Sequence, residues 1–167
     1  MKKALRFLIP AAAVILIVLV VLWQNGVFSP EKTGRKVGSV TLEVRCENAL
    51  AYGQLKETLR AILPEDGVLF QGTVDLLEDD TAFTVLERAC RREKIALSST
   101  GSTRYGIYVE GIGGLYEMDC GAQSGWMFSL NGSYPSKSAG SAELADGDRV
   151  IWVYTCDLGK DVGADAA

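Results

Sequence analysis

The segment 125–135 constrains the fold most, because it combines a strongly apolar strand with an Asn-Gly pair. Asn131-Gly132 predicts a tight hairpin turn of type I′, since both central residues of that turn need a positive φ. Side chains alternate between the two faces of a strand, so Trp126, Phe128 and Leu130 share one face. An apolar stripe of this kind either packs into a core or contacts a ligand, and both interpretations are open.

Residues 7–23 form an unbroken apolar run that follows three basic residues. A helix of that length spans about 26 Å, and adding residues 4–5 extends it to about 30 Å, the thickness of the hydrocarbon core. The run exceeds the roughly 7–15 apolar residues of a secretory signal, and no small-x-small cleavage site follows it. We therefore expect an uncleaved transmembrane anchor, with a cleaved signal as the alternative and with the basic N-terminus in the cytoplasm.

The charge of the remaining chain restricts its partners. Three of the 17 basic residues precede the apolar run and all 21 acidic residues follow it, so the rest of the chain carries a formal charge of −7. A protein that binds nucleic acid needs a basic face, and so does one that docks electrostatically on anionic lipids. We therefore expect the globular part to bind no nucleic acid and to contact the membrane through its N-terminal helix.

The segments that follow predict an α+β fold. Val40, Leu42 and Val44 alternate with polar residues, as in a half-buried strand. Residues 81–94 place apolar side chains at the spacing of an amphipathic helix. The chain should therefore form a curled sheet with this one main helix across one face. Further strands are expected over residues 68–77, 95–98, 106–110, 115–118, 126–130 and 149–156, and a short helix over residues 55–63.

The absence of histidine removes much catalytic chemistry. Neither a Ser-His-Asp nor a Cys-His arrangement can be built, and a histidine-based zinc site is excluded. The acidic run 78–80 fits the N-terminus of the helix that follows it, and Asp146 and Asp148 fit a turn. We therefore expect neither an enzyme nor a metal site.

Four cysteines lie in the part of the chain that we expect outside the cytoplasm. An even number in an oxidising compartment favours disulfide bonds, and the sequence alone allows three pairings. Their wide spacing, without a Cys-x-x-Cys motif, argues against a zinc site or a thioredoxin-like site. The disulfide candidates are Cys46, Cys90, Cys120 and Cys156.

Several motifs, in one order along the chain, resemble a known family. They are Cys46-Glu47-Asn48-Ala49, Pro64-Glu65-Asp66-Gly67-Val68, Thr84-Val85-Leu86-Glu87-Arg88, Tyr116-Glu117-Met118-Asp119-Cys120-Gly121, Ser124-Gly125-Trp126-Met127-Phe128 with Asn131-Gly132, and Asp146-Gly147-Asp148 leading to residues 152–159. With these motifs, residues 39–163 are similar to the bacterial surface domain related to the C-terminal β-domain of transcobalamin and intrinsic factor. The resemblance implies a β-grasp fold of the soluble ligand-binding type.

The resemblance also implies a ligand. In transcobalamin-like proteins the tryptophan hairpin faces the corrin ring of cobalamin, while a large helical barrel, which this chain lacks, supplies the other half of the site. Beyond the turn, Tyr134 is a further candidate, because an aromatic loop tip is costly to expose without purpose. Cobalamin is thus the candidate ligand, and no cofactor is firmly implied. The candidate ligand-binding residues are Trp126, Phe128, Leu130, Asn131 and Tyr134.

The implied fold also bears on the disulfides. The first and last strands of a β-grasp are parallel neighbours, which implies a Cys46–Cys156 bond with Cys90–Cys120 as its companion. The alternative is that some cysteines are reduced and buried, Cys90 first, since it continues the apolar stripe of the predicted helix.

These expectations combine into one hypothesis. It is a membrane-anchored extracytoplasmic module that binds cobalamin or a related corrinoid as an uptake accessory, with a surface or transporter protein as a further partner. The alternative is a cell-surface protein-interaction or structural module without a small-molecule ligand. The expected organisation is a signal anchor over residues 1–23, a linker over residues 24–38, a transcobalamin C-terminal-like domain over residues 39–159 and a tail over residues 160–167.

Overall fold

The structure of the chain, a computed structural model, describes residues 34–102 and 106–164. The expected signal anchor and most of the expected linker lie outside these residues. Among the helices of the described part, none combines the length and the apolar character that a membrane crossing demands. The described residues form a mixed α+β fold in which strands predominate.

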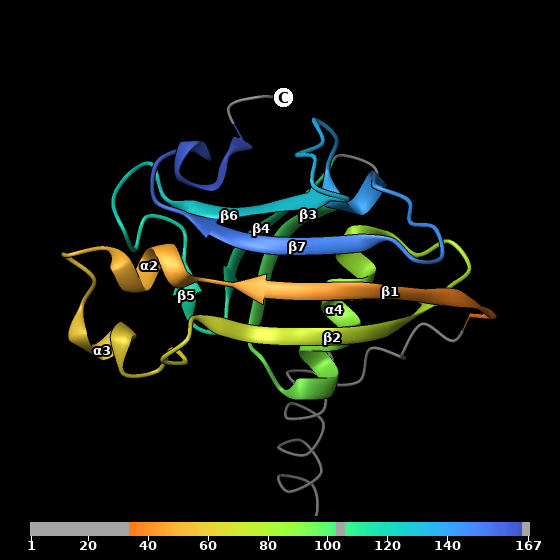
Figure 1. The fold of residues 1–167 in the computed structure, drawn as a ribbon, viewed down its shortest axis with the longest axis horizontal. Helices are drawn as coiled ribbons and strands as arrows, with labels where there is room; N and C mark the ends of the chain where they lie inside the picture. The colour runs from red at the N-terminus through yellow and green to blue at the C-terminus, as the bar shows by residue number, and fades with distance from the viewer. Residues whose placement is uncertain (1–33, 103–105, 165–167) are drawn as a thin grey trace, which may run out of the picture. The chain divides into compact units, whose positions relative to one another are not determined.

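The main sheet has four strands in the order β2-β1-β7-β6 (Figure 1). β1 pairs with β2, and β6 with β7, in antiparallel register, whereas β1 and β7 run parallel. The first and last strands are therefore the parallel neighbours that the family resemblance implies. The four strands are β1 (Lys36–Arg45), β2 (Val68–Leu77), β6 (Gly125–Leu130) and β7 (Arg149–Thr155).

A second sheet and one long helix lie behind the main sheet in the view of Figure 1. The second sheet has the order β3 (Leu97–Ser102), β4 (Gly106–Ile112) and β5 (Leu115–Tyr116). The helix is α4 (Ala82–Glu93). Inward-facing side chains from both sheets and from the helix form one hydrophobic core, which includes Leu42, Leu86, Ile112, Leu115 and Tyr154.

The local sequence explains where α4 begins and ends. The Thr84 amide donates to Thr81 Oγ1 at 3.3 Å and the Thr81 amide donates to Thr84 Oγ1 at 2.9 Å, which satisfies two amides at the N-terminus. At the other end Lys94 adopts a left-handed conformation with φ of 58°, which stops the helix. The predicted helix is confirmed, and it buries the predicted stripe of Ala82, Val85, Leu86, Ala89 and Cys90.

Several expected boundaries are wrong. The strand expected over residues 95–98 is β3, which begins at Leu97 and ends at Ser102. β1 begins at Lys36, inside the range expected as a linker, and the helix expected over residues 55–63 shrinks to the four residues of α3. No residue of α3 is buried, and a helix this short has little stability without tertiary packing. The remaining short elements are α2 (Glu47–Ala51), α3 (Glu57–Arg60) and the 3₁₀ turns η1 (Ala139–Ser141) and η2 (Lys160–Val162).

The Asn131-Gly132 turn forms, but the hairpin expected around it does not. Both residues have positive φ, 52° and 84°, and Leu130 and Ser133 exchange two backbone hydrogen bonds of 2.8 and 3.0 Å. After this single bridge the chain departs, and Pro135 has no amide to continue a ladder. Along its whole length β6 pairs instead with β7. A local turn signal cannot reveal that partner, because residues 131–148 separate the two strands.

Candidate ligand-binding groove

Trp126 and Phe128 face the hydrophobic core from β6. The Trp126 side chain is buried, and its indole Nε1 donates to the Leu115 carbonyl at 2.9 Å. Its ring meets Tyr154 edge-on, with 5.3 Å between centroids, while Phe128 packs against Trp152 at 5.2 Å. Leu130 belongs to the half-buried side chains packed on the same core. The predicted shared face of these strand residues is therefore the core-facing one.

Asn131 and Tyr134, the two other candidate ligand residues, make structural hydrogen bonds. Asn131 Nδ2 donates to Asp148 Oδ1 at 2.8 Å, and Asn131 Oδ1 accepts from the Arg149 amide at 2.9 Å. The Tyr134 hydroxyl donates to the Val162 carbonyl at 2.9 Å, and burial raises the pKa of this half-buried phenol. Asn131 thus ties its turn to the start of β7, and Tyr134 ties its loop to η2. Their predicted role in ligand binding stays a prediction.

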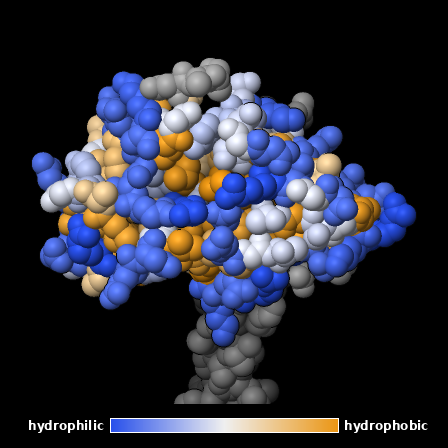
Figure 2. All heavy atoms as spheres, viewed as in Figure 1, coloured by the Kyte–Doolittle hydropathy of each residue, from blue (hydrophilic) through white to orange (hydrophobic). Residues whose placement is uncertain are grey.

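A groove of about 320 Å³ opens where β6 begins, and Trp126 lines it. The groove lies between the loop that precedes β6 and the loop that follows β7, and most of its exposed lining is apolar. Hydrophilic residues cover much of the face seen in Figure 2, where apolar atoms surface in separate areas between them. The lining residues are Tyr108, Glu117, Met118, Ala122, Gln123, Ser124, Gly125, Trp126, Met127, Thr155 and Leu158.

Two bulky apolar side chains stand at the rims of this groove in an unusual backbone conformation. Met118 has φ of 65° and is 64% exposed, and Leu158 has φ of 47° and is 63% exposed. Positive φ is uncommon for any side chain other than Gly, Asn or Asp and costs roughly 1–2 kcal/mol. The fold therefore holds both residues in a strained conformation that leaves their side chains in water.

Hydrogen bonds fix the two rim loops to each other and to the sheet. The Met118 amide donates to the Ser124 carbonyl at 3.1 Å, which closes the first loop on itself. The Leu158 amide donates to the Gln123 carbonyl at 3.0 Å, which joins the second loop to the first. Beneath them the Tyr154 hydroxyl donates to the Tyr116 carbonyl at 2.7 Å. Hydrogen bonds therefore hold both rim loops in defined positions.

One edge of the groove is polar. The Tyr108 hydroxyl donates a short hydrogen bond to Glu117 Oε2. That hydrogen bond, together with burial and the charges of Glu117 and Glu110, raises the pKa of Tyr108 to about 12. The groove therefore offers an apolar trough with a carboxylate and a neutral phenol along one side. This suits a ligand with a flat apolar part and a hydrogen-bond donor at its margin.

A larger cavity, about 470 Å³, lies at the start of α4 and has acidic walls that include Asp80 and Glu143. The Asp80 carboxylate there already accepts hydrogen bonds from the protein. Arg88 Nη2 donates to its two oxygens at 2.6 and 2.7 Å, and the Leu77 amide donates to Oδ2 at 2.7 Å. In the part of the chain that the structure describes, no group of three or more His, Cys, Asp or Glu side chains could hold a metal ion.

All four cysteines lie among the described residues, and all are free thiols. The bonds expected between Cys46 and Cys156 and between Cys90 and Cys120 are not present. Cys90 is buried in the stripe of α4, as the alternative reading had it. Cys120 and Cys156 lie near enough to each other for each thiol to influence the pKa of the other.

The sequence offers no signal that would single out Met118 and Leu158. Both occur in motifs that carry the family resemblance, but nothing in those motifs indicates a positive φ for a bulky side chain. Of the ligand-binding residues predicted from the sequence, Trp126 is the one that lines the groove.

Comparisons with known proteins give one family match and one distant likeness of fold. Residues 79–156 match the family described as a domain of unknown function, DUF4430. No curated protein matches the chain. A crystal structure of haptocorrin in complex with Cbi is similar over 75% of this chain, with a TM-score of 0.52 and 15% identity, and the match spans 27% of the haptocorrin chain.

A second solved structure, from Ruminococcus gnavus ATCC 29149 and provisionally described as a metal-binding protein, is similar over 71% of this chain and 96% of its own. Its TM-score is 0.41 and its identity 15%, which is too distant to carry an argument. The described domain therefore has a fold distantly similar to that of haptocorrin, and its central and C-terminal part is similar to the DUF4430 family.

Proposed function

We propose that this domain is a ligand-binding module whose site is the groove between Met118 and Leu158. One observation carries the proposal: two bulky apolar side chains, both in a left-handed backbone conformation, stand exposed on the two rims of a groove lined by Trp126. Strained conformations of this kind persist only where the surrounding structure enforces them, and they cluster at ligand clamps. Exposed apolar side chains around one hollow mark a binding surface.

The size of the groove indicates how much of a ligand it can contact. Pockets that enclose a drug-sized molecule measure roughly 300–1,000 Å³, and this groove of about 320 Å³ stands at the lower end. It can therefore hold one edge or one face of a large planar ligand but cannot enclose it. Weak binding by the isolated domain follows, since much of the ligand stays in water.

Cobalamin or a related corrinoid is the ligand class that we infer. The distant fold similarity to haptocorrin, a protein whose structure was solved in complex with Cbi, supports this choice. The matched part is 27% of the haptocorrin chain, in keeping with a domain that supplies only a portion of a site. The lack of histidine favours binding over catalysis.

The inferred location rests on the N-terminal sequence. The apolar run 7–23 behind three basic residues supports a single-pass anchor with the domain outside the cytoplasm. A module so placed could capture a corrinoid at the cell surface and pass it to a transporter component. The small, open groove also suits an apolar side chain of a partner protein, which keeps a protein-interaction module as the second candidate.

A calorimetric titration tests the proposal. The full-length chain in lipid nanodiscs is titrated with cyanocobalamin, alongside the variants Met118→Asn and Leu158→Asn. We expect saturable binding by the parent chain and a loss of roughly tenfold in affinity in each variant, about 1.4 kcal/mol for one lost apolar contact.

The matched control is Val37→Asn, which removes an exposed apolar side chain outside the groove lining. It should bind as the parent does. Binding that is equally strong in the two rim variants would contradict the assignment of the site. No binding to the parent chain would favour the protein-interaction module.

A further inference from the structure

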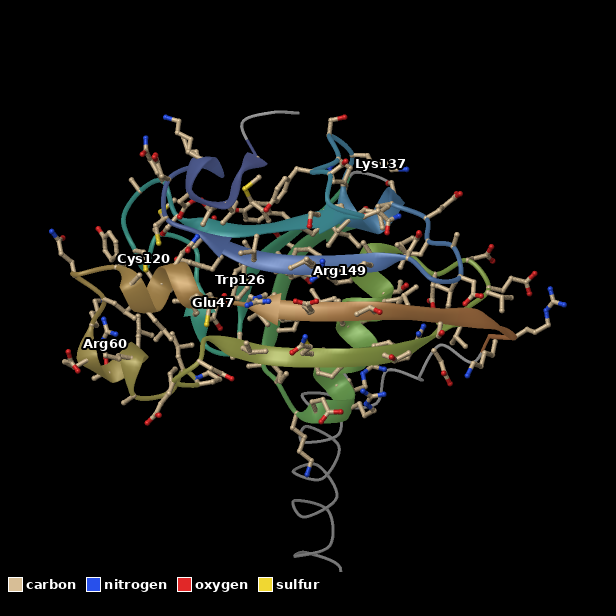
Figure 3. The ribbon with its side chains drawn as sticks, viewed as in Figure 1. Glu47, Arg60, Cys120, Trp126, Lys137 and Arg149 are labelled. Carbon is tan, nitrogen blue, oxygen red and sulfur yellow. The ribbon has the colours of Figure 1, made fainter. Side chains whose placement is uncertain are left out.

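Cys120 and Cys156 each lie between residues that line the groove. Cys120 lies in the loop that precedes β6 and is 2% exposed, while Cys156 is the first residue after β7 and is half-buried. Gly125 pairs with Thr155 in the sheet, and the Leu158 amide donates to the Gln123 carbonyl at 3.0 Å. The backbone therefore holds segments 120–125 and 155–158 side by side. Figure 3 shows Cys120 and Glu47 at the same end of the sheet, beside α2.

We propose that Cys120 and Cys156 form a reversible disulfide that ties together the two rims of the groove. Cys120 comes two residues after Met118, and Cys156 comes two residues before Leu158. A bond between them would therefore join the two strained loops at their base. The bond rests on the pairing of the two backbone segments that carry the thiols, and only its effect on a ligand rests on the proposed function.

The two other cysteines are poorer partners. Cys46 is fully buried, and burial together with nearby charges, that of Cys120 among them, raises the pKa of its thiol to about 12. Cys90 lies in the buried stripe of α4, where burial and the charge of Glu87 raise the pKa of its thiol to about 12. Cys156 is half-buried, and its Sγ donates to the Asn48 carbonyl at 3.5 Å.

The chemistry is a thiol–disulfide exchange with a small disulfide such as oxidised glutathione. The thiolate of Cys156, the more exposed of the two, attacks the oxidant and releases one glutathione. The Cys120 thiolate then attacks the mixed disulfide and releases the second glutathione. Two protein thiols are thus oxidised to one disulfide while one glutathione disulfide is reduced to two thiols. Burial raises the pKa of Cys156 to about 12, so the exchange should be faster at alkaline pH.

Peptide mapping tests the bond, because each cysteine lies on its own tryptic peptide: residues 46–56, 89–91, 105–137 and 150–160. The full-length chain in nanodiscs is incubated with oxidised glutathione at about pH 8.5, alkylated and digested without reductant. We expect peptide 105–137 joined to peptide 150–160, with a loss of about 2 Da that reductant reverses, and a rise in the urea midpoint. Cys120→Ser and Cys156→Ser should each abolish the bond, whereas Cys90→Ser should retain it.

Other outcomes overturn the proposal. A crosslink from peptide 46–56 to either partner would assign the bond elsewhere. Retained glutathione without a protein crosslink would show that the thiols cannot join.

The effect on ligand binding is a separate measurement. Titration of the oxidised and the reduced chain with cyanocobalamin should give the lower Kd for the oxidised form, because a fixed groove loses less freedom on binding. Equal affinities would overturn the coupling but leave the bond in place. A mapped bond with no binding to either form would count against the proposed function alone.

Discussion

Met118 has a left-handed backbone conformation, which asparagine or glycine would adopt at a lower steric cost. Asparagine tolerates the left-handed region through local hydrogen bonds, whereas methionine pays a steric penalty there. We expect Met118→Asn to raise the free energy of unfolding by about 0.5–1 kcal/mol while it weakens binding of a corrinoid. Urea denaturation and calorimetry on the same preparation measure the two effects.

Lys94→Asn is the matched control for this substitution. Lys94 has φ of 58° at the end of α4, and it is not among the residues that line the groove. The control should gain similar stability and bind as the parent chain does. If Met118→Asn neither stabilises the fold nor weakens binding, the interpretation of the rim as a strained clamp is wrong.

The two core tryptophans of the sheet differ in one hydrogen bond. The indole Nε1 of Trp126 donates to the Leu115 carbonyl, whereas that of Trp152 is buried without a partner among the described residues. Trp126→Phe should therefore cost about 1 kcal/mol more unfolding free energy than Trp152→Phe, since both remove a similar volume but only the first removes a hydrogen bond. Urea denaturation compares the two, and an equal or reversed cost would contradict the described hydrogen bonding.

At the scale of elements, the sequence predicts what local chemistry determines. α4 follows from its apolar spacing and the acidic run before it, and the positive φ of Asn131 and Gly132 follows from the turn type they favour. The partner of β6 does not follow, because pairing with β7 spans a long loop and depends on the whole sheet. The sequence predicts the groove only in part. It indicates Trp126, an aromatic residue on a predicted strand, but the strained conformation of the rims depends on backbone packing.

The start of α4 carries a buried ion pair that should make stability depend on pH. Burial by itself would raise the pKa of the Asp80 carboxyl, but hydrogen bonds from Arg88, the Leu77 amide and Thr84 outweigh it and lower that pKa below the ordinary 3.8. A carboxyl with a lowered folded-state pKa contributes stability that is complete above 3.8 and is lost as the pH falls through the folded-state value.

Asp80→Asn tests this pair. The variant leaves the half-buried Arg88 without its counter-charge, so we expect a loss of about 3 kcal/mol of unfolding free energy near neutral pH. Its unfolding free energy should also fall less steeply than that of the parent below pH 3.8. The exposed Glu65→Gln is the control. Parallel pH profiles of Asp80→Asn and the parent chain would show that the pair does not govern acid stability.

At the scale of the whole molecule, the domain resembles part of a larger binding protein. The match covers 75% of this chain but only 27% of haptocorrin. The proposed function therefore includes a second body that covers the exposed side of the ligand. A chain that supplies only part of a site should bind weakly alone and more tightly beside its partner, since a second set of contacts acts at high effective concentration.

Methyl NMR of the full-length chain in nanodiscs, titrated with cyanocobalamin, tests the central claim most directly. The account predicts that the methyl signals of Met118 and Leu158 shift along one common saturation curve, while the signal of Val37, which is exposed outside the groove lining, stays in place. Shifts that concentrate on residues away from the groove, or no shift at any attainable concentration of ligand, would contradict it.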